Sequence, residues 1–438
     1  MNSLEKIFAE KRTENGDVAY STTGSNLLDL LFMSEYYSKH LDEVKIGGSV
    51  KEQLFSMFVR DARFGLGKRD LGRELMKQSG LQPQWVVEAG RFDDLYKNPT
   101  SDNLEYLQAQ VLAGNELAKK WCPRLNSKDK KVAKELCKIW GLSEKEYRKL
   151  IKVDTTENKL SRHRVDEIDF EKVPSLALIK YYNRFMKELR FQKYIEAVKE
   201  GKKKINISTA TVYDIYKNRE KIDADLYFDK LEKIKINCVP ILDTSGSMWD
   251  DNDSIGKATC IAHYLGKCST YCPNQVVSFS SRPQLLTIHE KEGGYFDTYF
   301  QRYNSVRFGN SNKYCRELNS LYTGDCSNTD FGAVMRLFSG LEDAPEYLVV
   351  LSDMEFDRGS TMSKKQTMKR FKEWGYKTKI VWWNFNARNK TVPEIDEDGN
   401  IYISGYSPYL LKFLEVGFDG NKFLDKLIFE YRQYIENK

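Results

Sequence analysis

The stretch IKINCVPILDTSGSM, residues 234–248, decides the fold of the second half of the chain. Its first part, Ile234–Leu242, is an apolar run rich in β-branched residues, which predicts a buried strand. The run ends in the sequence Asp243-Thr244-Ser245-Gly246-Ser247, where Gly and Ser favour a tight turn. The strand therefore delivers one carboxylate and two hydroxyls, at alternating positions, to its carboxyl end.

Apolar strands and helices alternate from this point to the end of the chain. We expect strands at Gln275–Phe279, Gln284–Ile288, Tyr347–Leu351, Lys379–Trp383 and Ile401–Ile403. We expect helices at Ile255–Leu265, Phe331–Phe338, Lys364–Trp374, Leu410–Leu414 and Lys422–Ile435. This alternation predicts an α/β fold with a doubly wound parallel sheet. In such sheets ligands bind at the carboxyl ends of the strands.

Two later loops supply further oxygen ligands at that edge. Thr329 precedes a predicted helix, and Asp353 follows the strand Tyr347–Leu351. Carboxylate and hydroxyl oxygens suit Mg²⁺, with Mn²⁺ or Ca²⁺ as alternatives. The sequence thus predicts a metal site made of Asp243, Ser245, Ser247, Thr329 and Asp353. In the simpler alternative, these Ser and Thr residues only cap helices and form turns. A hydrolytic site would also need a general base, for which Glu355 is close in sequence.

The first half of the chain has helical periodicity. Helices are expected at Asn26–Tyr37, Val50–Arg60, Arg69–Lys77, Asn103–Leu112, Lys130–Ile139, Lys145–Ile151, Ala177–Leu189 and Phe191–Lys199. Ser143 followed by Glu146 fits a capping box. Short helices with short connections predict an all-α bundle or a solenoid of helix pairs. The change of period places the domain boundary between residues 233 and 234, so that we expect a helical domain at 1–233 and an α/β domain at 234–438.

Charge is divided unevenly between these halves. The 438 residues carry a net charge of +6, but residues 1–235 hold 45 basic and 37 acidic residues. The window 119–152 alone holds twelve basic and four acidic residues. Smaller basic clusters lie at residues 60–73 and 161–164. Grouped cations of this kind neutralise phosphates, and an excess in one half indicates a polyanionic partner. The alternative is a solvated helix face that binds nothing.

Several other classes of protein are disfavoured. No apolar stretch is long enough to cross a membrane. The N-terminus has no long apolar stretch and carries acids, so it does not resemble a signal peptide. Eight cysteines in 438 residues are too few for a disulfide scaffold, and Cys268 and Cys272 have no second pair at zinc spacing. The four histidines form no catalytic constellation. We therefore expect a cytoplasmic monomer that is not an enzyme.

The metal motif resembles the metal-ion-dependent adhesion site of von Willebrand factor A domains. That motif has the form Asp-x-Ser-x-Ser, then Thr, then Asp, and it matches this sequence residue by residue over about residues 234–438. The resemblance implies an open coordination position, which a carboxylate from a partner protein commonly fills. It therefore implies an adhesion site and not a catalytic one.

A helical region followed by an A domain resembles the Ro autoantigen family of RNA-binding proteins, which contain the TROVE module. The segment VRDARFGLGKRDLGREL (59–75) is similar to a helix-turn-helix of that family, although Phe64 replaces a glycine. YSTTGSNLLDLLF (20–32), KWCPR (120–124), IDFEKVPSLALIKYYNRF (168–185) and SDMEFD (352–357) are similar to an uncharacterised Ro-like group of viruses, plants and bacteria.

This resemblance implies that HEAT-like helical repeats close into a ring whose hole admits a single-stranded RNA end. It also implies that structured, noncoding or misfolded RNA binds the basic outer surface. The candidate RNA contacts are Arg60, Arg63, Lys68, Arg69, Lys119, Lys120, Arg124, Lys128, Lys130, Lys131, Arg162 and Arg164. Three hypotheses follow: a non-catalytic RNA-binding protein, a metal-dependent protein-interaction scaffold without RNA, and a metal-dependent nuclease.

Overall fold

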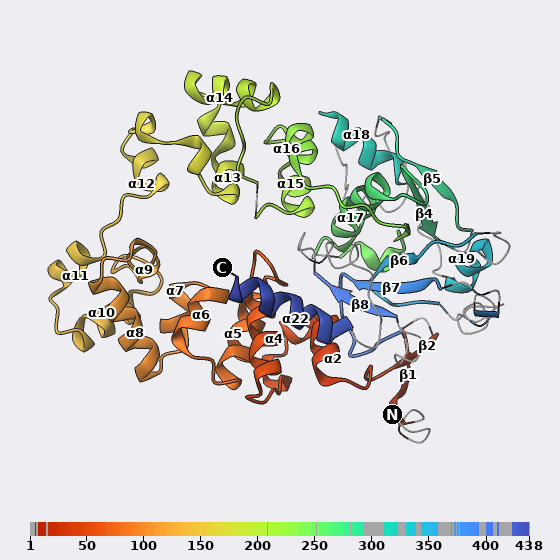
Figure 1. Cartoon of the computed structure of the whole chain (residues 1–438), viewed down its shortest axis with the longest axis horizontal. Coiled ribbons are helices and arrows are strands. Elements are labelled where there is room, and N and C mark those ends of the chain that lie inside the picture. Colours follow the sequence, from red (N-terminus) through yellow and green to blue (C-terminus); the bar gives the residue numbers. More distant parts are fainter. Residues whose placement is uncertain are drawn as a thin grey trace. The chain divides into compact units, whose positions relative to one another are not determined.

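The computed structural model divides the chain into two compact units (Figure 1). It describes residues 5, 8–14, 16–207, 209–250, 252–280, 282–292, 311–322, 330–338, 343–357, 369, 372–373, 375, 377–393, 400–405, 410 and 423–437. Unit 1 combines Met1–His40 with Pro174–Lys438, and unit 2 is Leu41–Val173. These limits differ from the boundary that the change of period predicts, because both ends of the helical half group with the sheet.

Unit 2 is helical throughout. Its α-helices are α4 (Val50–Arg60), α5 (Arg69–Gln78), α6 (Pro83–Ala89), α7 (Phe92–Lys97), α8 (Ser101–Leu112), α9 (Glu116–Trp121), α10 (Lys130–Ile139), α11 (Glu144–Leu150) and α12 (Thr156–Ser161). The predictions for α4 and α10 are confirmed with the same bounds. The Ser143–Glu146 capping box at the start of α11 is also confirmed, since the two side chains exchange hydrogen bonds with each other's backbone.

A buried ionic network holds the first helices of unit 2 together. Asp94 on α7 accepts hydrogen bonds from the guanidinium groups of Arg60 at 2.7 Å and Arg73 at 2.5 Å. It also accepts one from the backbone N–H of Arg91 at 2.9 Å. A Cβ added at Gly72 would lie 2.6 Å from the Cα of Arg60, so glycine at this position lets α5 approach α4 closely. Arg60 is only 4% exposed, so the structure corrects its assignment as an RNA contact: it is a core residue.

We expect the change Arg60→Met to destabilise unit 2 by about 3 kcal/mol, because it leaves the buried Asp94 carboxylate without one of its ion-pair partners. Urea unfolding of the whole chain measures this change. The matched control is Arg63→Met at an exposed loop position, which should stay within about 0.5 kcal/mol of the parent chain. A stable Arg60→Met variant that loses RNA binding would instead restore Arg60 as a contact residue.

The sheet of unit 1 has six strands in the order β5-β4-β3-β6-β7-β8. These are β3 (Cys238–Asp243), β4 (Gln275–Phe279), β5 (Leu285–Thr287), β6 (Tyr347–Ser352), β7 (Lys379–Asn384) and β8 (Ile401–Ser404). Strands β3, β4, β6, β7 and β8 pair in parallel, as predicted, but β5 pairs with β4 antiparallel. The connection from β4 to β5 is too short for a crossover and forms a hairpin instead. The sheet is therefore mixed.

Among the described residues, four helices follow strands or loops of this sheet along the chain. They are α17 (Ser254–Cys268), α18 (Lys313–Ser320), α19 (Phe331–Phe338) and α22 (Phe423–Glu436). The prediction for Phe331–Phe338 is confirmed with its bounds. The predicted helices Lys364–Trp374 and Leu410–Leu414 fall largely outside the described residues. Strands β3 and β6 are buried along their whole length, as expected for central strands.

The N-terminal segment packs against the sheet and does not join unit 2. It forms the hairpin β1 (Glu10–Arg12) and β2 (Val18–Tyr20), followed by α2 (Asn26–Phe32) and α3 (Ser34–Tyr37). Phe32 on α2 meets Tyr402 on β8 edge to face, with ring centroids 5.3 Å apart. The backbone of Tyr20 also pairs with that of Val392. The single helix expected at Asn26–Tyr37 is thus two helices.

Four more helices of the first half of the sequence also belong to unit 1. They are α13 (Ser175–Phe185), α14 (Leu189–Lys199), α15 (Val212–Asn218) and α16 (Ala224–Lys230). The Tyr213 hydroxyl on α15 donates to Asp253 at the start of α17 at 3.2 Å. Asp225 on α16 accepts from the backbone N–H of Tyr314 on α18 at 2.7 Å. Within the described residues, no helix is both long and apolar enough to span a membrane.

A buried acid links α17 to α18 and makes stability depend on pH. Burial alone would raise the pKa of Glu317, but hydrogen bonds with His263 at 2.7 Å and Lys267 at 2.8 Å outweigh burial and lower its pKa to about 2. A carboxyl whose pKa is lower in the folded chain stabilises the fold above its unfolded pKa, near 4.5, and this stabilisation is lost as pH falls towards 2.

We therefore expect Glu317→Gln to destabilise the chain by on the order of 2 kcal/mol at pH 7, and by much less at pH 3. Urea unfolding of the variant and the parent chain at both values measures the difference. If the free energies of unfolding of the variant and the parent chain differed equally at pH 7 and pH 3, the charge of the Glu317 carboxylate would not contribute to stability.

Candidate metal centre and nucleic-acid interface

The carboxyl end of β3 gathers three of the predicted metal ligands. Asp243, the last residue of the strand, is fully buried and accepts a hydrogen bond from the backbone N–H of Ser245 at 2.9 Å. A 3₁₀ turn over Gly246–Met248 brings the hydroxyl of Ser247 back to within 2.9 Å of the Ser245 hydroxyl. The alternating Asp-x-Ser-x-Ser spacing therefore does place these side chains together.

The end of β6 places the fourth predicted ligand, Asp353, beside them. The Ser352 hydroxyl donates to Oδ2 of Asp243, and Asp353 follows Ser352 directly. Asp353 is 2% exposed. The next residue, Met354, has a φ of +68°, a strained backbone conformation of the kind that tends to occur at functional sites. Thr329, the fifth predicted ligand, lies outside the described residues.

Burial and mutual repulsion act on these two carboxyl groups. Burial first, and then the negative charge of Asp353, raises the pKa of Asp243 to about 7. Burial also raises the pKa of Asp353, while the nearby Arg388 charge opposes this increase. A divalent cation between the two groups would offset both costs. Two carboxylates with two hydroxyls are hard oxygen donors, so the set fits Mg²⁺, Mn²⁺ or Ca²⁺ better than zinc.

The described part of the chain contains no denser cluster of acidic, histidine and cysteine side chains. Among the described residues, no group of three or more His, Cys, Asp and Glu side chains could hold a metal ion. Cys272 instead donates to the backbone carbonyl of Cys238, and both thiols are buried. The zinc alternative for Cys268 and Cys272 thus finds no support in the described part of the chain.

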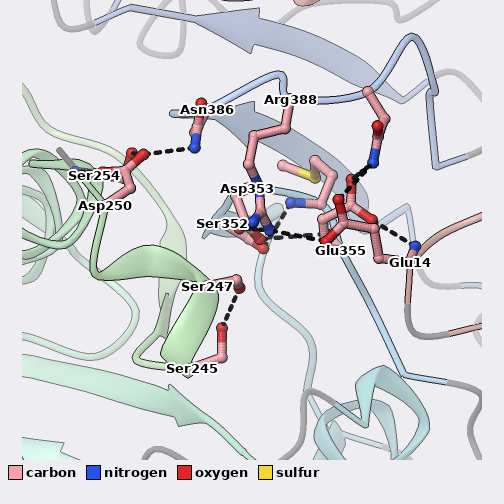
Figure 2. A network of polar contacts seen from close by, with 12 residues as sticks. Glu14, Ser245, Ser247, Asp250, Ser254, Ser352, Asp353, Glu355, Asn386 and Arg388 are labelled. Atoms are coloured by element: carbon pink, nitrogen blue, oxygen red, sulfur yellow. Dashed lines mark hydrogen bonds and ion pairs between the residues drawn. The ribbon is translucent and has the colours of Figure 1, made fainter. Parts of the chain in front are cut away.

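Further polar residues surround the site, and the sequence motif did not include them (Figure 2). Asp250 accepts hydrogen bonds from the backbone N–H and the hydroxyl of Ser254, each at 2.9 Å, and another from the Asn386 amide. Glu355 is 2% exposed and accepts from the backbone N–H of Glu14 at 2.8 Å and from Asn389 at 3.0 Å. In the sequence, the only indication that these residues belong to the site is their position shortly after β3, β6 and β7.

Arg388 is a cation of the network shown in Figure 2. Its guanidinium donates to Oδ2 of Asp353 at 3.0 Å. The same guanidinium nitrogen lies 3.6 Å from a carboxylate oxygen of Glu14, in the turn of the N-terminal hairpin. The side chain of Asp353 is fully buried in this pair, whereas those of Arg388 and Glu14 are 34% and 50% exposed.

The basic window 119–152 has its strongest exposed cluster on α10. Lys130, Lys134 and Lys138 follow one another at four-residue intervals, so they share one face of the helix, and Lys131 borders it. All four are exposed, while Ala133, Leu136 and Cys137 on the other side are buried. We call the four residues Lys130, Lys131, Lys134 and Lys138 the lysine face.

Few of these cations are neutralised by acids. Lys134 lies 3.7 Å from Glu144, which also pairs with Arg148. Glu146 is occupied by the capping box. Within the described residues, Lys130, Lys131 and Lys138 have no carboxylate within ion-pair distance, and neither do exposed Lys128, Lys145, Lys149 and Lys152 nearby. The excess of positive charge in residues 119–152 therefore lies on exposed side chains.

Other predicted RNA contacts have structural partners. Arg124 donates to the backbone carbonyls of Ile151 at 2.7 Å and Lys119 at 3.3 Å, so it ties the ends of two helices together. Arg164 pairs with Asp154 and Glu167. Lys119 and Lys120 are half-buried at the end of α9, and Arg162 is exposed.

The loop Gly65–Lys68 between α4 and α5 is a turn, and three of its backbone amides are paired within the chain. Its amides at Leu66, Gly67 and Lys68 donate to the carbonyls of Phe58, Asp61 and Val59 at 2.8–3.0 Å. These N–H groups are therefore already used. The side chains remain at the surface, with Arg63 and Arg69 exposed and Lys68 half-buried.

A small cavity of about 240 Å³ lies within unit 1, between α13 and α15. Leu176 and Ile179 give it an apolar wall, and two amides and two cations complete it: Asn183, Asn218, Lys180 and Lys221. The surrounding segment 174–222 holds twelve basic and five acidic residues. The basic clusters named in the sequence analysis did not include this second region.

Comparisons with known proteins identify relatives without an assigned role. Residues 237–426 match the family model DUF7788 and residues 109–238 match DUF2828, both described as domains of unknown function. The uncharacterized protein L728 of Acanthamoeba polyphaga mimivirus is 23% identical, with 91% of this chain and 83% of the viral protein covered.

Among solved structures, the Ro (RSR) protein of Deinococcus radiodurans aligns over 95% of this chain and 96% of its own. Its sequence identity is 12% and its TM-score is 0.39. A similarity at this level does not identify the fold. Over most of its length the chain is similar in sequence to the uncharacterized viral protein.

Proposed function

We propose that this protein binds RNA without cleaving it, through the lysine face of unit 2. The observation that carries the proposal is the exposed row of cations on α10, of which Lys130, Lys131 and Lys138 have no carboxylate partner among the described residues. A polyanion binds such a surface because the lysines neutralise its phosphates and the counterions condensed on them are released into solution. The sequence resemblance to Ro proteins supports RNA as the polyanion. The same resemblance implies a HEAT-like packing of the helices.

The partner in this proposal is structured RNA with unpaired ends. Rows of lysines contact phosphates without reading bases, so recognition depends on the shape of the RNA. The α13–α15 cavity offers a place where an unpaired nucleotide could contact amides and cations. Its volume is below the roughly 300–1,000 Å³ of pockets that enclose drug-sized ligands, which suits one small unit.

The test is fluorescence anisotropy with a labelled RNA hairpin that carries a single-stranded end, measured over a range of salt concentrations. The proposal predicts binding that weakens steeply with salt, with a logarithmic slope of about −3 or steeper if the lysine face contacts three or more phosphates. Binding that is absent at low salt would refute it.

We also propose that Asp243, Ser245, Ser247 and Asp353 hold a divalent cation, with Thr329 as a further ligand. A bound cation would supply an electrophilic centre for a carboxylate of a partner protein. Asp243 and Asp353 balance its charge, and Ser245 and Ser247 orient their hydroxyl oxygens toward the same edge. This makes an interaction scaffold the second candidate function, whether or not RNA is also bound.

A nuclease is the less favoured candidate. Hydrolysis needs a general base that is free to take a proton. Glu355, the nearest further carboxylate along the chain, accepts hydrogen bonds from Glu14 and Asn389 and is thereby held in place. We therefore expect labelled RNA to remain intact during incubation with the protein and Mg²⁺. Cleavage that Asp243→Ala abolishes would establish the nuclease instead.

A further inference from the structure

The network in Figure 2 places one cation, Arg388, between an inner and an outer carboxylate. The inner one is Asp353, whose Oδ2 accepts from the guanidinium at 3.0 Å. The outer one is Glu14, whose oxygen lies 3.6 Å away. Asp353 is also one of the residues proposed to hold the divalent cation. Arg388 and that cation therefore share a carboxylate.

Both neighbours of Arg388 are held in fixed positions. Asp353 follows β6 directly and also accepts a hydrogen bond from the backbone N–H of Glu355. The backbone N–H of Glu14 donates to Glu355 at 2.8 Å, and its carboxylate accepts from the Asn389 amide at 3.1 Å. The Thr13 hydroxyl donates to the carbonyl of Phe356 at 2.6 Å. The N-terminal hairpin thus presents Glu14 to Arg388 from outside.

We propose that Arg388 and Glu14 tune the affinity of the metal site in opposite directions. Arg388 acts against the metal, because its charge repels a cation at Asp243 and Asp353 and its hydrogen bond occupies Asp353. Glu14 acts for the metal, because it attracts Arg388 away from Asp353 and adds negative charge outside the site. This inference rests on the proposed metal site and adds to it the two residues that set its strength.

A purely structural role for Arg388 leads to a different expectation. If the ion pair only braced the loop after β7, its loss would lower thermal stability and would weaken or leave unchanged the binding of metal. A charge-setting role instead predicts tighter binding. The sign of the change in affinity therefore separates the two roles, even if the variant is somewhat less stable.

The experiment titrates the full chain with Mn²⁺ and follows free Mn²⁺ by electron paramagnetic resonance. Arg388→Gln should bind Mn²⁺ about tenfold more tightly than the parent chain, a coupling of ordinary size. Glu14→Gln should bind it roughly fivefold more weakly. Arg388→Lys, which keeps the charge, should stay near the parent value.

Two matched variants serve as controls. Arg432→Gln removes a half-exposed arginine on α22 that pairs with Glu436, and Glu10→Gln removes an acid from the same hairpin as Glu14. Neither should change the affinity for Mn²⁺.

The possible outcomes distinguish the proposed roles of Arg388 and Glu14 from the proposed metal site itself. A parent chain that binds Mn²⁺ with the same affinity as Arg388→Gln, or more tightly, overturns the role of Arg388 and leaves the metal site standing. Failure of both the parent chain and Arg388→Gln to bind Mn²⁺ overturns the metal site and the inference together. Opposite shifts for the two variants, with unchanged controls, support both.

Discussion

Changing Lys130, Lys131 and Lys138 to glutamate in one variant is expected to weaken RNA binding by about 10²–10³-fold at moderate salt. Each lysine that contacts a phosphate contributes a salt-dependent share of the affinity, and glutamate adds repulsion to that loss. The three side chains are exposed and lie away from the buried Ala133, Leu136 and Cys137, so the helix should fold normally. Anisotropy titrations over several salt concentrations should also show a shallower slope, by about three.

The matched control is a second triple variant with the same change in net charge, Lys235→Glu, Lys291→Glu and Lys377→Glu. These three lysines are exposed in unit 1. If both triple variants lose affinity equally, only the overall charge matters and the lysine face is not the interface.

Removal of the Asp243 carboxylate is expected to abolish binding of divalent cations to the α/β domain. Asp243 is the fully buried carboxylate of the proposed site, and the remaining Asp353 is already paired with Arg388. Mg²⁺ should raise the thermal unfolding temperature of the parent chain, because a ligand that binds only the folded chain stabilises it, and it should leave that of Asp243→Ala unchanged.

The variant should fold in the absence of metal, since the change removes a buried carboxyl group whose pKa is raised to about 7. Asp229→Ala, at an exposed position on α16, is the matched control and should respond to Mg²⁺ as the parent chain does. If Mg²⁺ raised the unfolding temperature of Asp243→Ala as much as that of the parent chain, Mg²⁺ would bind at a site that does not include Asp243.

Local sequence signals predicted most of the elements that carry these sites. The bounds of α4, α10, β4 and α19 follow from apolar periodicity, and the start of α11 follows from its capping box. The alternating Asp243, Ser245 and Ser247 come together because one short turn contains all three. The local sequence pattern is sufficient to predict an element or a turn whose contacting residues are close together in the sequence.

Contacts between distant segments could not be predicted in the same way. Arg388 meets Asp353 because β6 and β7 are adjacent strands, and Glu14 reaches them from the other end of the sequence. The assignment of the N-terminal segment to the sheet depends on pairs such as Tyr20 with Val392. The pattern of apolar residues within the N-terminal segment does not indicate which distant strand the segment contacts.

Charge counts also have a limit, which Arg60 illustrates. Its cluster looked basic because its nearest acids in sequence are few, yet Asp94 lies 34 residues away and accepts its hydrogen bond in the core. The lysine face differs because its helix turns those side chains away from the buried residues. An excess of charge therefore indicates an interface only after ion pairs and burial have been taken into account.

The most direct test of RNA binding through unit 2 is ultraviolet crosslinking of the purified chain to a labelled RNA hairpin, followed by mass spectrometry of the crosslinked peptides. We expect crosslinks within residues 119–152, centred on α10, and we expect them to disappear in the Lys130, Lys131 and Lys138 variant. Crosslinks confined to residues 234–438, or none in this window despite measurable binding, would contradict it.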